Sequence, residues 1–155
     1  MRALLIVNPV ASRVTAAVEQ TAIRELEEAA SVEVVRTTRH GEATALAAAA
    51  AEQGFDAVLV LGGDGTANEV LNGVGDALPI GLMPGGGTSV MPRNLGLPPS
   101  IPAAARRLAT ALREGTSRHV RVGRLNGRRF AFNAGVGLDA DVVRRVDTHQ
   151  RTAKH

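Results

Sequence analysis

Short apolar runs alternate in this chain with longer stretches in which apolar residues recur every three or four positions. A short continuous apolar run is typical of a strand that is buried on both faces of a parallel sheet. Parallel strands need crossover connections, which helices usually supply. The alternation therefore predicts an α/β fold, a Rossmann-like parallel sheet with helices on both faces. The expected strands are 3–7, 31–36, 57–61 and 78–83, and the expected helices are 15–30, 41–53, 66–74 and 102–114.

The pattern changes toward the C-terminus. The stretches 119–125 and 129–133 are strand-like, and they flank Asn126-Gly127, a dipeptide typical of tight hairpins. Because the two stretches follow each other directly, we expect them to pair antiparallel. We therefore predict an α/β domain over residues 1–116. Residues 117–155 would form a β hairpin and the beginning of an incomplete second domain.

The composition excludes several classes of function. There is no cysteine, which excludes disulfides and thiolate zinc sites, and the histidines show no shared ligand spacing. Aromatic residues make up only 2% of the chain, so we expect no nucleic-acid partner that relies on base stacking. The net charge is +3, and all of the Lys and Arg residues except Lys154 are arginines. It would favour a phosphate substrate or an anionic membrane, although arginines that simply solvate helix faces would give the same charge.

The segment Gly62-Gly63-Asp64-Gly65-Thr66 lies where a buried strand ends and a helix begins. Ligands of open parallel sheets bind beyond the carboxyl ends of the strands, and a helix N-terminus there favours phosphate. A carboxylate beside phosphates needs a cation between them, and Mg²⁺ is the natural one. The alternative is a purely structural turn in which Asp64 or Thr66 caps the helix. The P-loop and the dinucleotide fingerprint both fail here, because the required lysine and third glycine are absent.

Residues 62–73 carry the string GGDGT-x-NEV-x-NG without a break. This string resembles the diacylglycerol kinase catalytic domain, whose N-terminal domain has the fold shared with NAD kinases. The resemblance implies ATP and Mg²⁺ as cofactors and a lipid hydroxyl as the phosphoryl acceptor. It implies that Asp64 is the catalytic residue and the metal ligand. It also implies nucleotide contacts from Gly62, Gly63, Asp64, Gly65, Thr66, Asn68 and Glu69.

Other segments match the same family in order. Asn8-Pro9 ends the first strand as in the N-P-x-x-G loop, although Ser12 or Arg13 replaces that glycine. Thr37, followed by residues 41–43, resembles T-x-x-x-G-D-A, whose threonine contacts the nucleotide. The resemblance therefore implies that Asn8, Pro9 and Thr37 bind the nucleotide. A strand-end hydroxyl that satisfies a local backbone group is the alternative for Thr37.

The loop over residues 84–93 resembles P-x-G-T-x-N-x-x-A-R, and it implies nucleotide contacts from Gly86, Gly87, Thr88 and Arg93. It departs from the family pattern where Gly87 replaces threonine and Ser89 replaces asparagine. Thr88 is in a position to supply the missing hydroxyl from one place along. Arg93 would neutralise phosphate charge where lysine is absent, and the alternative is a surface arginine without a ligand.

Residues 130–140 resemble the beginning of the family's second, lipid-binding domain, with Asp139 either facing the interdomain cleft or capping a helix. We therefore expect the nucleotide-binding half of a lipid kinase that is cytoplasmic and peripheral at the membrane. Its expected partners are ATP, a lipid substrate and a second copy in a homodimer. A kinase for NAD or for a sphingoid base stays open as an alternative. A non-catalytic nucleotide-binding module and a structural module also stay open.

Overall fold

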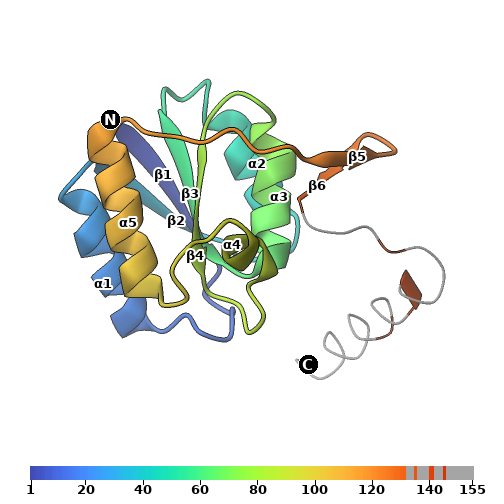
Figure 1. The fold of residues 1–155 in the computed structure, drawn as a ribbon, viewed down its shortest axis with the longest axis horizontal. Helices are drawn as coiled ribbons and strands as arrows, with labels where there is room; N and C mark the ends of the chain where they lie inside the picture. Colours follow the sequence, from blue (N-terminus) through green and yellow to red (C-terminus); the bar gives the residue numbers. More distant parts are fainter. Residues whose placement is uncertain (132–134, 136–139, 142–144, 146–155) are drawn as a thin grey trace.

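The structure, a computed structural model, describes residues 1–131 together with 135, 140, 141 and 145. Its elements follow the predicted alternation (Figure 1). The strands are β1 (Arg2–Val7), β2 (Ser31–Arg36), β3 (Ala57–Gly62), β4 (Ile80–Pro84), β5 (Gly123–Leu125) and β6 (Arg128–Phe130). The helices are α1 (Ala16–Glu27), α2 (Glu42–Ala49), α3 (Asp64–Val74), α4 (Val90–Asn94) and α5 (Ile101–Glu114).

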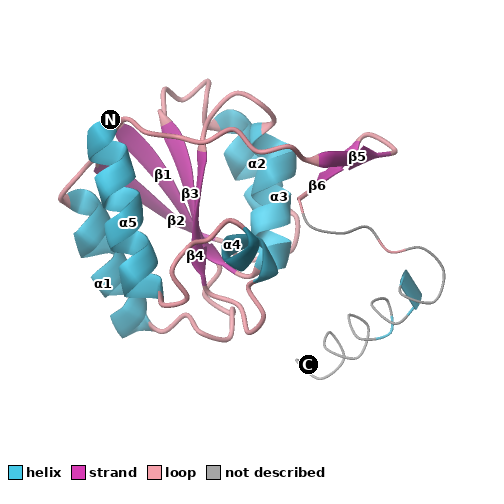
Figure 2. Ribbon diagram, viewed as in Figure 1, coloured by secondary structure: helices cyan, strands magenta, loops and turns pink. Residues whose placement is uncertain are grey.

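Strands β1 to β4 form one parallel sheet in the order β2-β1-β3-β4 (Figure 2). Leu5, near the middle of β1, pairs with Val34 on one side and with Leu59 on the other. Helices α1 and α5 cover one face of this sheet, and α2 and α3 cover the other (Figure 1). Strands β5 and β6 form a separate antiparallel hairpin. The predicted α/β fold is confirmed.

The central strands are apolar throughout because each has a hydrophobic layer on both faces. Successive side chains of a strand point to opposite faces, so neighbours in sequence enter different layers. Leu4 and Ile6 pack with the residues of α2 and α3, whereas Leu5 and Val7 pack with those of α1 and α5. All of β3 is buried. This explains why the sequence shows continuous apolar runs in place of alternation.

Helix α5 ends at Glu114, as predicted, and begins one residue earlier than predicted, at Ile101. The Ser100 hydroxyl caps the first turn by accepting a hydrogen bond from the Ala103 N–H at 3.3 Å. Pro102 lies in that first turn, where its missing N–H has no consequence. Gly115 ends the helix with φ of 64°, a left-handed conformation that favours glycine.

The sequence predicts a loop over residues 84–92. The structure instead begins helix α4 at Val90, so the prediction is wrong for the end of this segment. Three consecutive glycines and Pro92 favour a loop, but Pro92 is tolerated because it lies in the first turn of this short helix. The turn is capped from another element, since Asp64 accepts hydrogen bonds from the N–H groups of Val90 and Met91. Helix α3 also begins two residues earlier than expected, at Asp64.

The first strand of the hairpin is shorter than predicted. Residues 119–122 are exposed and run past β4 as an extended segment, and β5 begins only at Gly123. In residues 1–131, no strand pairs with the outer edge of β4, and a cavity of about 820 Å³ lies between that edge and residues 115–122. Residues 132 and 133 of the second predicted strand, and Asp139, lie outside the described residues.

We expect Gly73→Ala to destabilise the protein, because helices α2 and α3 meet at this glycine. A methyl group there would overlap the carbonyl oxygen of Thr44 and lie 2.8 Å from the Ala47 methyl. Separating two packed helices costs about 1–3 kcal/mol of unfolding free energy, which denaturant unfolding would measure. The control is Gly65→Ala in the same helix, where a methyl meets nothing within 4 Å. Equal stability changes in the two variants would contradict the prediction.

Candidate functional site

A cleft of about 410 Å³ opens at the carboxyl end of the sheet. The loops that follow β1, β2 and β3 line it, and the turn after β4 contributes one glycine. This is where ligands of open parallel sheets bind. Its lining residues are Asn8, Val10, Ala11, Thr37, Thr38, Arg39, His40, Gly63, Gly65, Thr66, Glu69 and Gly86.

The turns after β3 and β4 touch through glycines on the cleft side. A Cβ atom on Gly86 would lie 2.9 Å from the Cα of Gly63, and one on Gly85 would lie 3.0 Å from the Cα of Gly62. The Gly85 N–H donates to the Gly62 carbonyl oxygen at 2.8 Å. Any side chain at Gly85 or Gly86 would force the turns apart. Part of the cleft wall is therefore bare backbone, at the N-terminus of α3, and such a surface suits a phosphate group.

The Asn8 side chain connects the end of β1 to the start of α3. Its Nδ2 donates to the Thr66 hydroxyl at 3.0 Å, and its Oδ1 accepts from the Val10 N–H at 3.2 Å. The two residues thereby hold the first and third strand ends together at the cleft. Pro9, which follows Asn8, is exposed and does not line the cleft.

The Asp64 carboxylate points toward α4. It accepts the Val90 N–H at 2.9 Å and the Met91 N–H at 2.8 Å, and the Thr88 hydroxyl lies 3.3 Å from its Oδ2. Asp64 therefore caps α4, whereas the sequence left open a cap on its own helix. A carboxylate has about four acceptor sites, so these bonds leave capacity for a hydrated cation.

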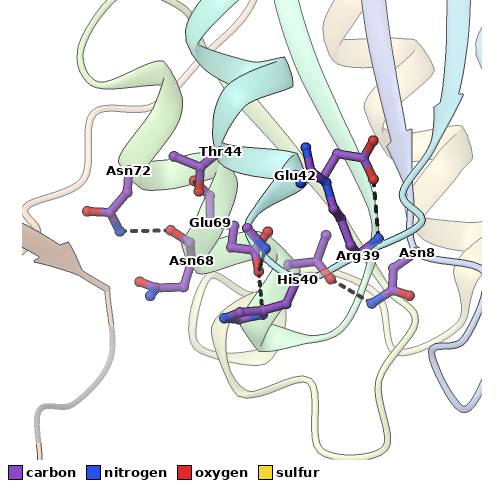
Figure 3. Close-up of polar contacts among 10 residues, drawn as sticks. Asn8, Arg39, His40, Glu42, Thr44, Asn68, Glu69 and Asn72 are labelled. Carbon is purple, nitrogen blue, oxygen red and sulfur yellow. Dashed lines mark hydrogen bonds and ion pairs between the residues drawn. The ribbon is translucent and has the colours of Figure 1, made fainter.

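Two glutamates fix the loop between β2 and α2. The Glu42 carboxylate accepts the Thr38 N–H at 2.6 Å, the Thr38 hydroxyl at 3.0 Å and the Arg39 N–H at 3.3 Å. The backbone and side-chain bonds from Thr38 hold the pKa of Glu42 below its usual range. Glu69 Oε1 accepts the Gly41 N–H at 3.0 Å and lies 2.9 Å from His40 Nδ1 (Figure 3). The loop is thus tied to both α2 and α3.

The basic side chains of the cleft come from this loop. Arg39 and His40 line the cleft, whereas Arg93 is exposed on α4 and does not. The sequence resemblance singled out the threonine and glycine that flank Arg39 and His40, and it missed the residues between them. The signal that could have identified Arg39 and His40 is that they are basic. No lysine lies near any of the glycine turns, so other basic residues were the candidates for contacting phosphate.

The two asparagines in the second half of the GGDGT-x-NEV-x-NG string, Asn68 and Asn72, contact the hairpin and not the cleft. Asn72 exchanges two hydrogen bonds with the backbone of Arg129, donating to its carbonyl at 3.0 Å and accepting from its N–H at 2.8 Å. With its amide oriented to suit its neighbours, Asn68 donates to the same carbonyl at 3.1 Å. Figure 3 shows both asparagines on one side of α3, away from Asn8. They anchor strand β6.

Some of the predicted nucleotide-binding residues line the cleft, and others lie outside its lining. Among the described residues, no group of three or more His, Asp or Glu side chains could hold a metal ion. The predicted residues in the lining are Asn8, Thr37, Gly63, Gly65, Thr66, Glu69 and Gly86. Those outside the lining are Pro9, Gly62, Asp64, Asn68, Gly87, Thr88 and Arg93.

The Thr37 hydroxyl satisfies a backbone group, as its alternative reading predicts. It donates to the Val7 carbonyl oxygen at 3.4 Å, and the Thr37 N–H donates to the same oxygen at 2.9 Å. Thr37 nevertheless lines the cleft. The local bond and a contact with a ligand are compatible, because a hydroxyl oxygen can also accept hydrogen bonds.

Comparison with solved structures supports the fold. The crystal structure of a diacylglycerol kinase from Bacillus anthracis str. Sterne superposes with a TM-score of 0.74 at 30% sequence identity, covering 83% of this chain and 45% of that one.

Comparison of sequences supports the family. The diacylglycerol kinase of Bacillus subtilis (strain 168) is 36% identical over 119 residues, or 75% of this chain and 38% of its own length. That of Staphylococcus saprophyticus is 36% identical over 104 residues, covering 65% of this chain and 33% of the relative. The chain thus spans well under half the length of these curated relatives. Residues 2–125 match the family described as "Diacylglycerol kinase catalytic domain", and the chain belongs to that family.

Proposed function

We propose that this chain forms the ATP-binding half of a lipid kinase that transfers the γ-phosphate of ATP to a lipid hydroxyl, such as that of diacylglycerol. The observation that supports this most is the contact between the two glycine turns at the mouth of the sheet, which leaves part of the cleft wall without side chains. Family membership implies ATP as the phosphoryl donor. The lipid acceptor comes from the names of the relatives.

The proposed roles follow from the geometry. The backbone of Gly63, Gly65 and Gly86 would bind phosphate oxygens, helped by the partial positive charge at the start of α3. Arg39 would supply the positive charge that lysine provides elsewhere, and His40 would offer a hydrogen-bonding imidazole beside it. Phosphoryl transfer depends mainly on positioning and on charge neutralisation, and these groups can provide both.

Asp64 would hold Mg²⁺ through water or orient the acceptor hydroxyl. Bound Mg²⁺ would neutralise charge on the phosphates. Thr88 lies beside Asp64 and would take over the task of the threonine that Gly87 replaces. A general base and the lipid-binding surfaces would come from the remainder of a longer chain. Pro9, Asn68 and Arg93, which the sequence also assigns to the nucleotide, lie outside the cleft lining, as Asp64 and Thr88 do. Their contacts with the nucleotide stay a prediction.

The acceptor would be reached at a cytoplasmic membrane surface. No helix in the described part of the chain is long and apolar enough to cross a bilayer. A homodimer stays a prediction.

A non-catalytic nucleotide-binding module is the second candidate. The observation that favours it is the altered loop after β4, where Ser89 adopts φ of 45° and its hydroxyl donates to the Gly86 carbonyl at 2.8 Å. The Ser89 hydroxyl is therefore engaged within the loop. ATP binding without phosphorylation of any lipid, in a chain as long as the relatives, would favour this candidate.

We expect Asp64→Asn to weaken binding of ATP-Mg about tenfold, or ~1.4 kcal/mol, while leaving ATP binding in EDTA nearly unchanged. The charge that attracts the cation is lost, whereas the single amide oxygen can still accept one of the two N–H groups that Asp64 binds at the start of α4. Titration followed by thermal shift would measure both affinities. Asp76→Asn, just beyond the C-terminal end of the same helix, is the control. If Asp64→Asn weakens ATP equally with and without Mg²⁺, the residue acts only as a cap.

We expect Gly86→Ala to abolish the rise in melting temperature on adding ATP, because the new methyl would push the two glycine turns apart. Its own cost in unfolding free energy would be about 1–3 kcal/mol. Gly87→Ala is the matched control, since a Cβ there lies 3.7 Å from the Ser12 hydroxyl, an ordinary contact. It should change stability by less than about 0.5 kcal/mol and preserve the ATP effect. A normal ATP response in Gly86→Ala would argue against phosphate binding at this wall.

A further inference from the structure

The lining of the cleft contains an acidic side chain, although the cleft is proposed to bind the phosphates of ATP. The ionisable residues of the lining are Arg39, His40 and Glu69. A carboxylate repels phosphate through their like charges. The charge of Glu69 would offset that of Arg39, so the charge that a phosphate meets in the cleft depends on whether His40 carries a proton.

His40 lies directly beside the Glu69 carboxylate. Its Nδ1 is 2.9 Å from Glu69 Oε1, the oxygen that also accepts the Gly41 N–H at 3.0 Å (Figure 3). Because a carboxylate oxygen only accepts hydrogen bonds, we assign a hydrogen to Nδ1. The nitrogen that gains or loses a proton is therefore Nε2, which has no hydrogen-bond partner among the described residues. The Glu69 side chain is only 12% exposed, whereas that of His40 is 76% exposed.

The charged neighbours of His40 on its own loop and on α2 keep their charge near neutral pH. Arg39, the preceding residue, stays protonated at any pH at which the protein is folded. At the start of α2, the Glu42 carboxylate accepts the Thr38 and Arg39 N–H groups. The bonds from Thr38 hold the pKa of Glu42 below its usual range, so Glu42 also stays ionised.

The other elements around the cleft add no further group that would titrate with His40. Asp64, at the start of α3, directs its carboxylate to the N–H groups of α4. The loop after β1, residues 8–12, contains no charged side chain. From the hairpin, Arg128 reaches the Asn68 side chain on α3. Histidine is the side chain that ordinarily changes charge between about pH 5 and 8, so His40 is the group of the lining that responds in this range.

We propose that the His40–Glu69 pair makes ATP binding depend on pH, with the cleft binding phosphate more tightly when His40 is protonated. The protonated ring neutralises Glu69 and presents an Nε2–H donor, whereas the neutral ring presents only a lone pair, which phosphate oxygens repel. Glu69 is a positioning residue here, because it holds the ring by Nδ1. The inference rests on the proposed function, since it requires ATP in this cleft.

The sign of the pH dependence follows from the charge of the ligand. A bound anion favours the protonated form of His40. The additional affinity is therefore fully present at low pH and is lost as the pH rises through the range in which histidine titrates.

The test is calorimetric titration of the 155-residue chain with ATP-Mg at about pH 5.5 and about pH 8.5, on either side of the histidine range. The terminal phosphate of ATP also titrates, so each affinity is compared with that of His40→Gln at the same pH. Wild type should bind on the order of tenfold more tightly than His40→Gln at the lower pH. At the higher pH the two proteins should bind equally.

A second variant, Glu69→Gln, distinguishes the charge from a merely structural role. Its amide oxygen can still accept the Gly41 N–H, but the negative charge is gone. At the higher pH it should bind ATP-Mg on the order of tenfold more tightly than wild type, a gain that misfolding does not produce. The matched control is His119→Gln, at an exposed histidine outside the cleft lining, which should keep the wild-type pH profile.

Three results would overturn the proposal. One is a ratio of wild-type to His40→Gln affinity that is the same at both pH values. Another is weaker binding by Glu69→Gln than by wild type at the higher pH, and the third is loss of the wild-type profile in His119→Gln. Any of these with ATP still bound refutes the role of the pair and leaves the nucleotide site standing. Absence of ATP binding to wild type at both pH values refutes the nucleotide site and this inference together.

Discussion

The site depends on the close approach of two glycine turns, those after β3 and β4. The parallel sheet brings the two strand ends side by side, and the absence of side chains at Gly63 and Gly86 lets their backbones touch. Asp64 then binds the start of α4 and holds the second turn in place. The close approach of the two turns therefore explains both the bare backbone at the cleft and the position of the Asp64 side chain. Phosphate binding on this wall would be a consequence of the same packing.

Helix α3 connects this cleft to the rest of the molecule, and each part of it has a separate partner. Its N-terminus contributes the glycine turn, and Glu69 in its middle fixes the loop that carries Arg39 and His40. Asn72, toward its C-terminal end, and Asp76, just beyond it, hold the hairpin. Gly73 lets α2 lie close enough to complete the layer. One short string of sequence thus serves the cleft, the core and the anchoring of the hairpin.

Much of the site could be predicted from sequence, and the errors have physical reasons. The glycines and Asp64 were found because they interrupt a strand-to-helix junction in a distinctive order. Arg93 is exposed on α4 and lies outside the cleft lining, so its predicted contact with phosphate stays a prediction. Arg39 and His40 line the cleft, but local sequence does not tell which loop will face it. Helix α4 was missed because its cap comes from Asp64, 26 residues before Val90.

The sequence by itself determined the α/β fold, the positions of the main strands and helices within a few residues, and the glycine-rich strand end that marks the site. These depend on local patterns, which are apolar runs, helical periodicity and residues that only certain backbone conformations accept. Only the tertiary structure decided which side chains meet. Asp64 caps a distant helix, Glu69 holds a loop, and Asn68 and Asn72 bind a hairpin, because the partners are brought together by packing across the sheet and are not neighbours in the chain.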